Sequence, residues 1–363
     1  MPQPTPTQLV LIEVAGAAVL GGYAINRACF VAGIVVGVMA LAGAVVPLHR
    51  RWLYQVQGSW LGLMRRRRAA AHRPGFAGLL GDYQVESVAG GRRGSNLGVI
   101  RSGTTWSLPL VLGLEGVFND DAAVPVDLLA GLLRIEDVPL SSVRLITVTT
   151  PAHAMAQAPD GPAAPMTQLA ARYCLLTLDT RRTAETIGAR GGTQAAIHQI
   201  LRRCAVHTEQ VLATAGVTVR RLDENAAASL FATFMGPSSP ASGRRGQQTA
   251  ETWGDVRVGG TWSTVFAVTG SGADVTDRVL RLAAAAPTPV VTTSLMLQPT
   301  ARSPHFEATM LVRISAPDLA PPQDAFRSLA LLAQAYDLVM QRLDGEQGQL
   351  LRATTPLGVG ESS

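Results

Sequence analysis

The chain has 363 residues, of which 47% are hydrophobic and 16% are charged, and its formal net charge is +5. This much apolar side-chain surface excludes a largely disordered protein, and three scattered cysteines exclude a disulfide-stapled scaffold or a CxxC metal site. A mean hydropathy of +0.20 favours a membrane-embedded minority attached to an ordinary globular part.

Two apolar segments near the start of the chain predict a helical hairpin in a membrane. Residues 9–25 carry a single charge, Glu13, and residues 28–48 carry none. Each is long enough for a helix to cross the hydrocarbon layer at about 1.5 Å per residue. Only Asn26 and Arg27 separate the two segments, so an external sensor domain between them is excluded. A cleaved signal peptide is the alternative, but the preceding tail lacks a positively charged side chain.

Arginines after the second apolar segment predict its orientation. Arg50 and Arg51 follow it closely, and residues 65–68 are four consecutive arginines. Positive charge beside a span marks its cytoplasmic side. We therefore expect both termini and the globular part in the cytoplasm, with the two spans in the inner membrane.

The charge is unevenly spread along the chain. Residues 50–101 hold ten arginines against Asp82 and Glu86, whereas residues 102–363 hold 20 arginines against 23 acids. The basic balance therefore belongs to the segment beside the membrane. This distribution favours a membrane-surface patch over a nucleic-acid-binding domain.

Three features of the N-terminal part bear on how its helices pack and how they meet the membrane. Gly33 and Gly37 form a GxxxG motif, which lets two helices approach closely, although glycine is abundant throughout the chain. Glu13 is an ionisable group within a span, near enough to its start to reach the interface. Apolar residues at near-helical spacing then predict a helix that lies on the bilayer: Trp52, Val56, Trp60, Leu63 and Met64.

These patterns predict four regions. Residues 1–48 form the membrane anchor and residues 49–75 a basic juxtamembrane segment. Residues 76–352 form a cytosolic α/β domain that contains a mobile loop at 236–250, and residues 353–363 form a frayed tail.

Strand and helix patterns alternate within the globular part. Thr193 can cap a long helix that ends before Gly216. The predicted helices cover residues 124–134, 193–215, 225–235, 275–285 and 324–343. The predicted strands cover residues 97–100, 106–112, 143–148, 173–178, 217–222, 262–268, 290–297 and 309–315. Strands interleaved with helices predict an α/β sheet covered by helices.

The sequence contains none of the common catalytic motifs. All of the 31 basic residues are arginine, so chemistry that needs a lysine is excluded, including the P-loop. His198 and His207 fall on opposite faces of one predicted helix and cannot share a metal ion. We expect structural or surface roles for all six histidines: His49, His72, His153, His198, His207 and His305.

A few residues remain as weak candidates for binding. Arg190-Gly191-Gly192-Thr193 stands at a helix start and could cradle an anion, but its glycines also suit a plain turn. Asp120-Asp121 is better explained as charge at a helix start than as a metal motif. Gly90–Gly94 is interpreted as a basic turn, and Cys174 and Cys204 as core residues. We predict no catalytic, cofactor-binding or metal residues.

Several short segments, in their order and spacing, resemble the EccE family, the membrane component of the type VII secretion system of actinobacteria. The paired apolar segments lead into the arginine-rich stretch, and most of the chain takes part in the resemblance. The other segments are Val143–Leu145, Thr149–Ala152, Arg172–Asp179, Ala189–Thr193, Ile200–Cys204 and Gly216–Leu222.

The resemblance implies a structural, non-enzymatic subunit of an inner-membrane secretion machine. It implies a cytosolic domain similar to a glycosyltransferase-like α/β fold, no catalytic residues and no cofactor. It also implies partners among the other membrane components of the complex, including an ATPase. The alternative is a membrane-anchored enzyme that acts on a nucleotide-sugar or a lipid, for which Arg190–Thr193 is the candidate anion site.

Overall fold

The computed structural model of the chain is described here for residues 6–45, 47–48, 51–72, 79–90, 96–113, 124–150, 169–235, 249–271, 274–286, 290–300, 306–317 and 323–357. Outside these residues lie Asp120-Asp121, most of the Gly90–Gly94 turn and residues 236–248 of the loop predicted at 236–250, whose last two residues belong to a strand instead. The chain divides into two compact units, Met1–Arg65 and Arg66–Ser363, and each is described by itself.

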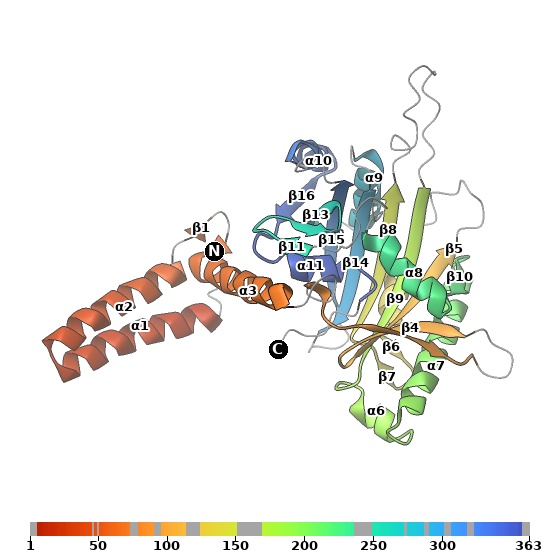
Figure 1. The fold of residues 1–363 in the computed structure, drawn as a ribbon, viewed down its shortest axis with the longest axis horizontal. Helices are drawn as coiled ribbons and strands as arrows, with labels where there is room; N and C mark the ends of the chain where they lie inside the picture. The colour runs from red at the N-terminus through yellow and green to blue at the C-terminus, as the bar shows by residue number, and fades with distance from the viewer. Residues whose placement is uncertain are drawn as a thin grey trace, which may run out of the picture. The chain divides into compact units, whose positions relative to one another are not determined.

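The first unit contains two consecutive helices, α1 (Pro6–Ile25) and α2 (Arg27–Val45), which lie side by side (Figure 1). Asn26 joins them, and its side-chain Oδ1 accepts a hydrogen bond of 2.8 Å from the amide of Cys29. This is the capping contact expected of an asparagine at a helix start. Among the described helices, α1 has a stretch, Gln8–Ile25, that is long and apolar enough to cross a membrane, whereas the apolar stretch Arg27–Ala42 is shorter.

The second predicted span ends earlier than the sequence suggested. The helix stops at Val45, and Pro47–Leu48 (β1) pairs with Arg51–Trp52 (β2) as a small antiparallel ladder. Pro47 explains the difference, because proline lacks an amide hydrogen and disfavours helical backbone in the residue before it.

Glycines let α1 and α2 approach at backbone distance. A Cβ added to Gly33 would collide with the carbonyl oxygen of Ala18, and one added to Gly37 would lie 2.9 Å from Cγ2 of Val19. Gly22 of α1 meets the backbone of Cys29 in the same way. The GxxxG motif is therefore confirmed as a packing surface between these two helices.

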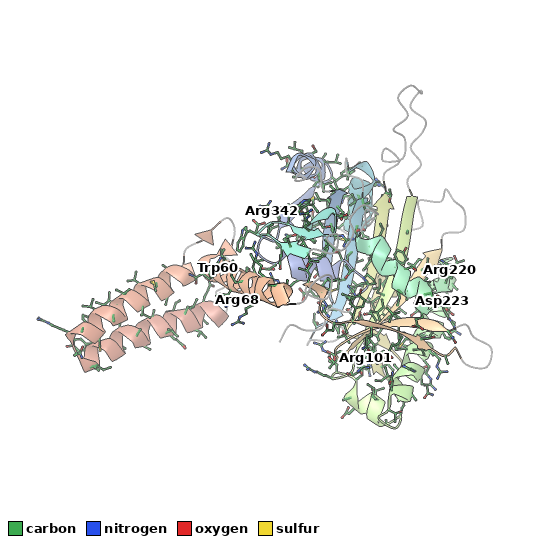
Figure 2. All side chains as sticks on the ribbon, in the orientation of Figure 1. Trp60, Arg68, Arg101, Arg220, Asp223 and Arg342 are labelled. Atoms are coloured by element: carbon green, nitrogen blue, oxygen red, sulfur yellow. The ribbon has the colours of Figure 1, made fainter. Side chains whose placement is uncertain are left out.

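Helix α3 (Leu53–His72) follows as one continuous helix. Its two faces differ in exposure: Trp60 and Leu61 are about half exposed, whereas Leu63 is buried. Trp60 and Arg68 of this helix are labelled in Figure 2. The predicted helix after the second apolar segment is confirmed, and it extends through the whole arginine run.

The second unit is built on a 12-stranded sheet (Figure 1). In spatial order its path is β11 (Thr249–Glu251), β12 (Val256–Val258), β13 (Thr261–Gly270), β15 (Phe306–Pro317), β14 (Val290–Pro299), β8 (Ser142–Thr150), β9 (Leu169–Asp179), β5 (Thr105–Gly113), β4 (Leu97–Ser102) and β3 (Gln84–Val88). In addition, β10 (Thr218–Arg221) pairs with β5, and β16 (Leu338–Arg342) pairs with β13. Every pairing in the described part of the chain is antiparallel.

Helices cover both faces of this sheet, because side chains alternate along each strand. One face packs its apolar residues, such as Leu145 and Cys174, with α5 (Val126–Gly131), α7 (Gln194–Thr214), α9 (Val275–Ala285) and α10 (Gln323–Ala335). The opposite face, which includes Ile146 and Tyr173, packs with α8 (Glu224–Met235). Farther along that face, α11 (Gln347–Ala353) covers Val265 and Leu311.

Two short elements complete the unit. Helix α6 (Ala184–Gly188) precedes α7, and Arg134–Ile135 (β6) pairs with Val138–Pro139 (β7). The mixed α/β class is thus confirmed, with a large antiparallel sheet at its centre. Likeness to a glycosyltransferase fold stays a prediction.

Most predicted elements occur where the sequence placed them, and α7 begins after Thr193, whose hydroxyl accepts the Ala196 amide at 3.4 Å. Two predictions were wrong in extent. The sequence predicted a helix at 124–134, but α5 covers only Val126–Gly131, and Arg134 belongs to strand β6 instead. The helix expected at 324–343 ends at Ala335, and Leu338–Arg342 is strand β16 instead. Strand β3 and helix α11 were not predicted.

The segment after Arg352 is also ordered further than expected. Residues 353–357 are buried, and Leu357 is completely so. Buried Arg144 of β8 donates hydrogen bonds to the carbonyl oxygens of Ala353, Thr355 and Leu357. These contacts hold the segment against the sheet, so the expectation of a frayed tail is wrong for residues 353–357.

Candidate functional site

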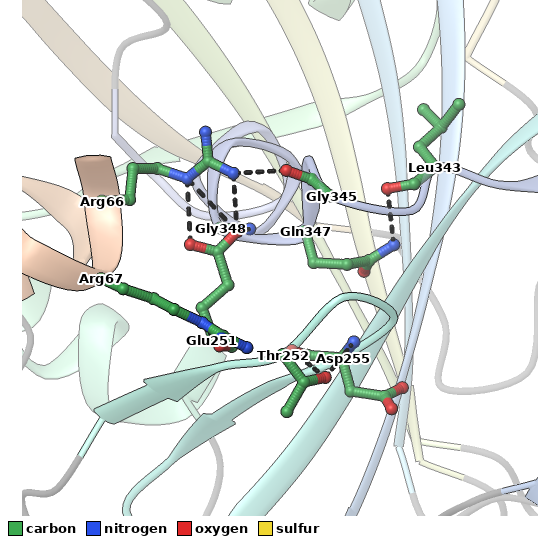
Figure 3. Close-up of polar contacts among 9 residues, drawn as sticks. All are labelled: Arg66, Arg67, Glu251, Thr252, Asp255, Leu343, Gly345, Gln347 and Gly348. Carbon is green, nitrogen blue, oxygen red and sulfur yellow. Dashed lines mark hydrogen bonds and ion pairs between the residues drawn. The ribbon is translucent and has the colours of Figure 1, made fainter. Parts of the chain in front are cut away.

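A buried carboxylate joins the arginine run of α3 to the sheet. We call the cluster of Arg66, Arg67, Glu251, Gly345 and Gly348 the anchor site (Figure 3). All five residues belong to the second unit. Arg66 and Arg67 come from α3, Glu251 ends strand β11, and the two glycines flank the start of α11.

Arg66 and Glu251 form a forked ion pair. Nε of Arg66 lies 2.9 Å from Oε2 of Glu251, and Nη2 lies 2.9 Å from Oε1. The Glu251 side chain is 2% exposed and that of Arg66 19%, so the pair is largely shielded from water. Paired and planar geometry of this kind gives a charge-assisted contact that is stronger than a neutral hydrogen bond.

Backbone groups complete the anchor site. The amide of Gly348 donates to Oε1 of Glu251 at 2.8 Å, and Nη2 of Arg66 donates to the carbonyl of Gly345 at 2.5 Å. Nε of Arg67 donates to the Glu251 carbonyl at 2.7 Å. A Cβ at position 348 would lie 2.8 Å from Oε2 of Glu251, so the carboxylate needs glycine there.

The turn before α11 is fixed independently. The buried Gln347 amide accepts from the Val265 amide at 2.8 Å and donates to the Val265 carbonyl at 3.1 Å. Gly345 has φ +80°, a conformation that glycine adopts at little cost. Its amide donates to the Trp253 carbonyl at 2.6 Å. The anchor site is therefore assembled on a rigid support of strands and turns.

The anchor site fits a structural role. The Glu251 carboxylate is bound by Arg66 and by the Gly348 amide, and its side chain is only 2% exposed, so solvent and a reacting group have little access to it. Sequence reasoning missed Glu251 because its partner Arg66 is 185 residues away in the chain, and no local residue pattern predicts a pair at that separation. The same reasoning assigned the whole arginine run to lipid headgroups, whereas Arg66 and Arg67 contact protein.

The predicted anion site is differently arranged. Nη2 of Arg190 pairs with Asp137 at 2.8 Å, and Nη1 donates to the Thr186 carbonyl at 3.0 Å. The hydrogen bond from Arg190 is the main reason that the pKa of Asp137 lies below its usual value. Gly191 and Gly192 both have positive φ, as a tight turn before a helix requires.

A groove of about 440 Å³ lies beside the start of α7. Gly192 and Thr193 line it, together with Arg101, Trp106 and Thr180, but Arg190 does not. Gly192 and Thr193 of the predicted motif therefore line a groove, whereas Arg190 is bound to Asp137 and does not line it.

The predicted histidine and cysteine roles can be placed in the structure. His198 is half-buried near Glu86 and the Trp106 ring, and burial lowers the pKa of His198. His207 lines a separate surface groove along α7. Cys174 and Cys204 are completely buried, which confirms them as core residues, and burial raises the pKa of each thiol to about 12.

No metal-binding arrangement is present in the described ranges, where no three or more histidine, cysteine or acidic side chains gather. His49, His153 and His305 lie outside these ranges, and the side chain of His72 is not described.

Comparison with known proteins gives one family. No curated protein matches the chain. The family model called EccE, described as "Putative type VII ESX secretion system translocon, EccE", matches residues 169–268. The matched stretch runs from β9 through α7 and α8 into β13, and it includes Glu251 of the anchor site. The resemblance seen in the sequence is thereby confirmed over residues 169–268, which match the EccE family model.

Proposed function

We propose that the protein is a non-enzymatic structural subunit of an inner-membrane type VII secretion complex. The observation that carries the proposal is the EccE match over residues 169–268, which supports a component of the translocon. The helix α1, apolar over Gln8–Ile25 and packed against α2, supports a membrane anchor ahead of that region.

In this proposal α1 and α2 cross the membrane as a hairpin, with both termini and the sheet domain in the cytoplasm. The arginines that follow the hairpin favour that orientation. The partners are the other membrane components of the complex, including an ATPase. We keep the domain bounds predicted from the sequence, 1–48, 49–75, 76–352 and 353–363, as an approximate division. The anchor site links residues on both sides of the boundary at residue 75.

The enzyme alternative depends on Arg190, whose guanidinium is held by Asp137 and by the carbonyl of Thr186. No observation in the described residues favours it over the subunit. The predicted likeness to a glycosyltransferase concerns the fold alone, and fold does not determine activity.

Affinity purification tests the proposal. The full chain, tagged after Ser363, is solubilised mildly from native membranes with and without crosslinking, and co-purifying proteins are identified by mass spectrometry. An unrelated two-span membrane protein with the same tag is the control. We expect a large complex that contains a secretion ATPase. Recovery of the protein alone, even after crosslinking, contradicts the proposal and makes nucleotide-sugar binding by wild type and Arg190→Ala the next measurement.

Protease protection tests the orientation separately. In intact spheroplasts the C-terminal tag should resist added protease, and in lysed spheroplasts it should be cleaved. Cleavage of the tag in intact spheroplasts contradicts the cytoplasmic placement while leaving the family assignment untouched.

A further inference from the structure

Helix α3 has two chemically distinct faces. At about 100° per residue, Trp60, Leu61 and Arg65 fall on one side, and Leu63 and Arg66 fall on the other. Trp60 and Leu61 are 51% and 52% exposed, whereas Leu63 is 2% exposed. We call Trp60, Leu61 and Arg65 the outer stripe of α3.

The arginines of the run differ in their contacts. Arg66 and Arg67 are bound to Glu251 and to neighbouring backbone carbonyls in the anchor site. Arg65 is exposed and follows Leu61 by one helical turn, so it belongs to the outer stripe. The consecutive arginines therefore have two different environments, which composition alone does not reveal.

The composition and position of the outer stripe match one kind of surface. An exposed tryptophan and leucine beside a cation suit the boundary of a bilayer, where the indole lies at headgroup level and arginine meets anionic lipid. Helix α3 begins soon after α2 ends at Val45, and α2 and the start of α3 belong to the same unit. A short link keeps the stripe close to the membrane that the apolar helices enter.

We propose that the outer stripe of α3 rests on the anionic lipid headgroups of the membrane, while Arg66 and Arg67 are bound within the protein. This inference depends on the proposed function in one respect, namely that α1 and α2 are membrane-embedded. It adds a lipid-binding surface and assigns Arg65 of the run to it.

The test uses the full chain in lipid nanodiscs. Cys29 is replaced by serine, and the two cysteines that remain, Cys174 and Cys204, are completely buried. A Leu61→Cys variant carries an environment-sensitive fluorophore, and Val206→Cys on α7, where Val206 is 41% exposed, is the matched control. The nanodiscs contain phosphatidylcholine alone or with phosphatidylglycerol. They also contain a lipid with a nitroxide spin label near its headgroup, which quenches a fluorophore that contacts the headgroup layer.

We expect the fluorophore at position 61 to shift to the blue and to be quenched in anionic nanodiscs, and less so in neutral ones. Raising the salt concentration should remove most of the difference, because mobile ions screen exposed charges. Arg65→Gln and Arg65→Glu should each lose much of the quenching, whereas Arg203→Glu on α7 should not. The label at position 206 should remain unquenched throughout.

Three results would overturn the inference. The first is no quenching at position 61 in either lipid, and the second is equal quenching in both lipids, which would remove the role of charge. The third is crosslinking of position 61 to another protein in native membranes, which would make a protein the occupant of the stripe. Alkaline carbonate extraction of the native membranes separates these failures from failure of the proposed function: a chain that resists extraction keeps its embedded helices whatever α3 contacts.

Discussion

The anchor site shows what an arginine can do beyond carrying a surface charge. Glu251 is a buried carboxylate, and taking a charge out of water costs several kcal/mol unless partners replace the lost solvation. Here Arg66 and the amide of Gly348 supply those partners, from segments far apart in the chain. Removing one partner leaves the other buried and unsatisfied, which costs more than the intact pair gains.

A double-mutant cycle measures this coupling. We expect Arg66→Met and Glu251→Gln each to lower the free energy of unfolding by about 3 kcal/mol, in the range for breaking a buried pair. The double variant should lose much less than the sum, because neither charge is then left without its partner. Urea unfolding of the full chain in mild detergent, followed by tryptophan fluorescence, gives the values.

The exposed pair of Arg101 and Glu86 is the matched control. Its atoms are 3.5 Å apart, and its side chains are 44% and 21% exposed. Water screens such a pair, so Arg101→Met should cost no more than about 1 kcal/mol. Equal losses for the Arg66 and Arg101 variants would contradict the structural role of the anchor site.

Two further arginines, Arg144 and Arg313, are buried in the sheet, and backbone carbonyls instead of a carboxylate bind their guanidinium groups. Arg144 donates to the carbonyl of Ala353, the last residue of α11, and to that of Thr355 just beyond the helix. Nη2 of Arg313 donates to the Phe234 carbonyl near the end of α8 at 2.5 Å. Helix ends leave carbonyl groups without helical partners and bear partial negative charge, so a guanidinium suits them. Burial lowers the pKa of Arg144 to about 9, aided by Arg352, and that of Arg313 to about 10. Both side chains therefore stay charged at neutral pH.

At the scale of elements, the packing of α1 against α2 depends on missing side chains. Gly33→Val would place branched carbons where the backbone of Ala18 lies, so the helices must separate. Gly21→Val is the control, because nothing lies within 4 Å of a Cβ at Gly21. Spin labels at two exposed positions on facing helices, Leu20→Cys and Val31→Cys in a Cys29→Ser background, report the separation.

We expect Gly33→Val to lengthen and broaden the distance distribution between these labels in nanodiscs, and Gly21→Val to leave it unchanged. An unchanged distance in the Gly33 variant would show that the close approach of the two helices does not hold in a bilayer.

The elements that sequence patterns predicted well are those with a strong local signal. Helix α7 has a capping threonine, a long apolar stripe and Gly216 with φ +74° at its end. Strand β9 contains the mainly apolar run Tyr173–Leu178 inside a sheet. The central part of the fold could therefore be predicted from the sequence.

The elements that failed are governed by distant contacts. Residues 338–342 continue the apolar spacing of α10, but they pair with residues 266–270 of β13, and Asp337 turns the chain with φ +52°. The segment at 353–357 contains no pattern of its own and is held by Arg144, which is more than 200 residues away in sequence. The anchor site was missed for the same reason, because a pairing between Arg66 and Glu251 leaves no periodicity to detect.

At the scale of the whole molecule, these contacts redefine where the domain built on the 12-stranded sheet begins and ends. A fragment of residues 76–352 lacks Arg66 and Arg67, which leaves Glu251 without its cation. It also lacks the carbonyls of residues 353–357, which leaves buried Arg144 without acceptors. A fragment of residues 53–357 retains both sets of contacts.

We expect residues 53–357 to unfold cooperatively in urea and residues 76–352 to be less stable by several kcal/mol or insoluble, as about 3–5 kcal/mol is typical for each uncompensated buried charge. The intermediate fragments 53–352 and 76–357 separate the two contributions. Equal stability of 76–352 and 53–357 would contradict the importance of both contacts.

The junction between α1 and α2 has a consequence for how the protein can be reached. Asn26 alone joins the two helices. If α1 and α2 both cross a membrane as proposed, the junction between them exposes almost no residues on the far side. An antibody, a protease or an impermeant label applied from that side would then find almost no binding or cleavage site in this hairpin. In the proposed arrangement, the α1–α2 junction offers any part of the complex exposed on that side little beyond Asn26.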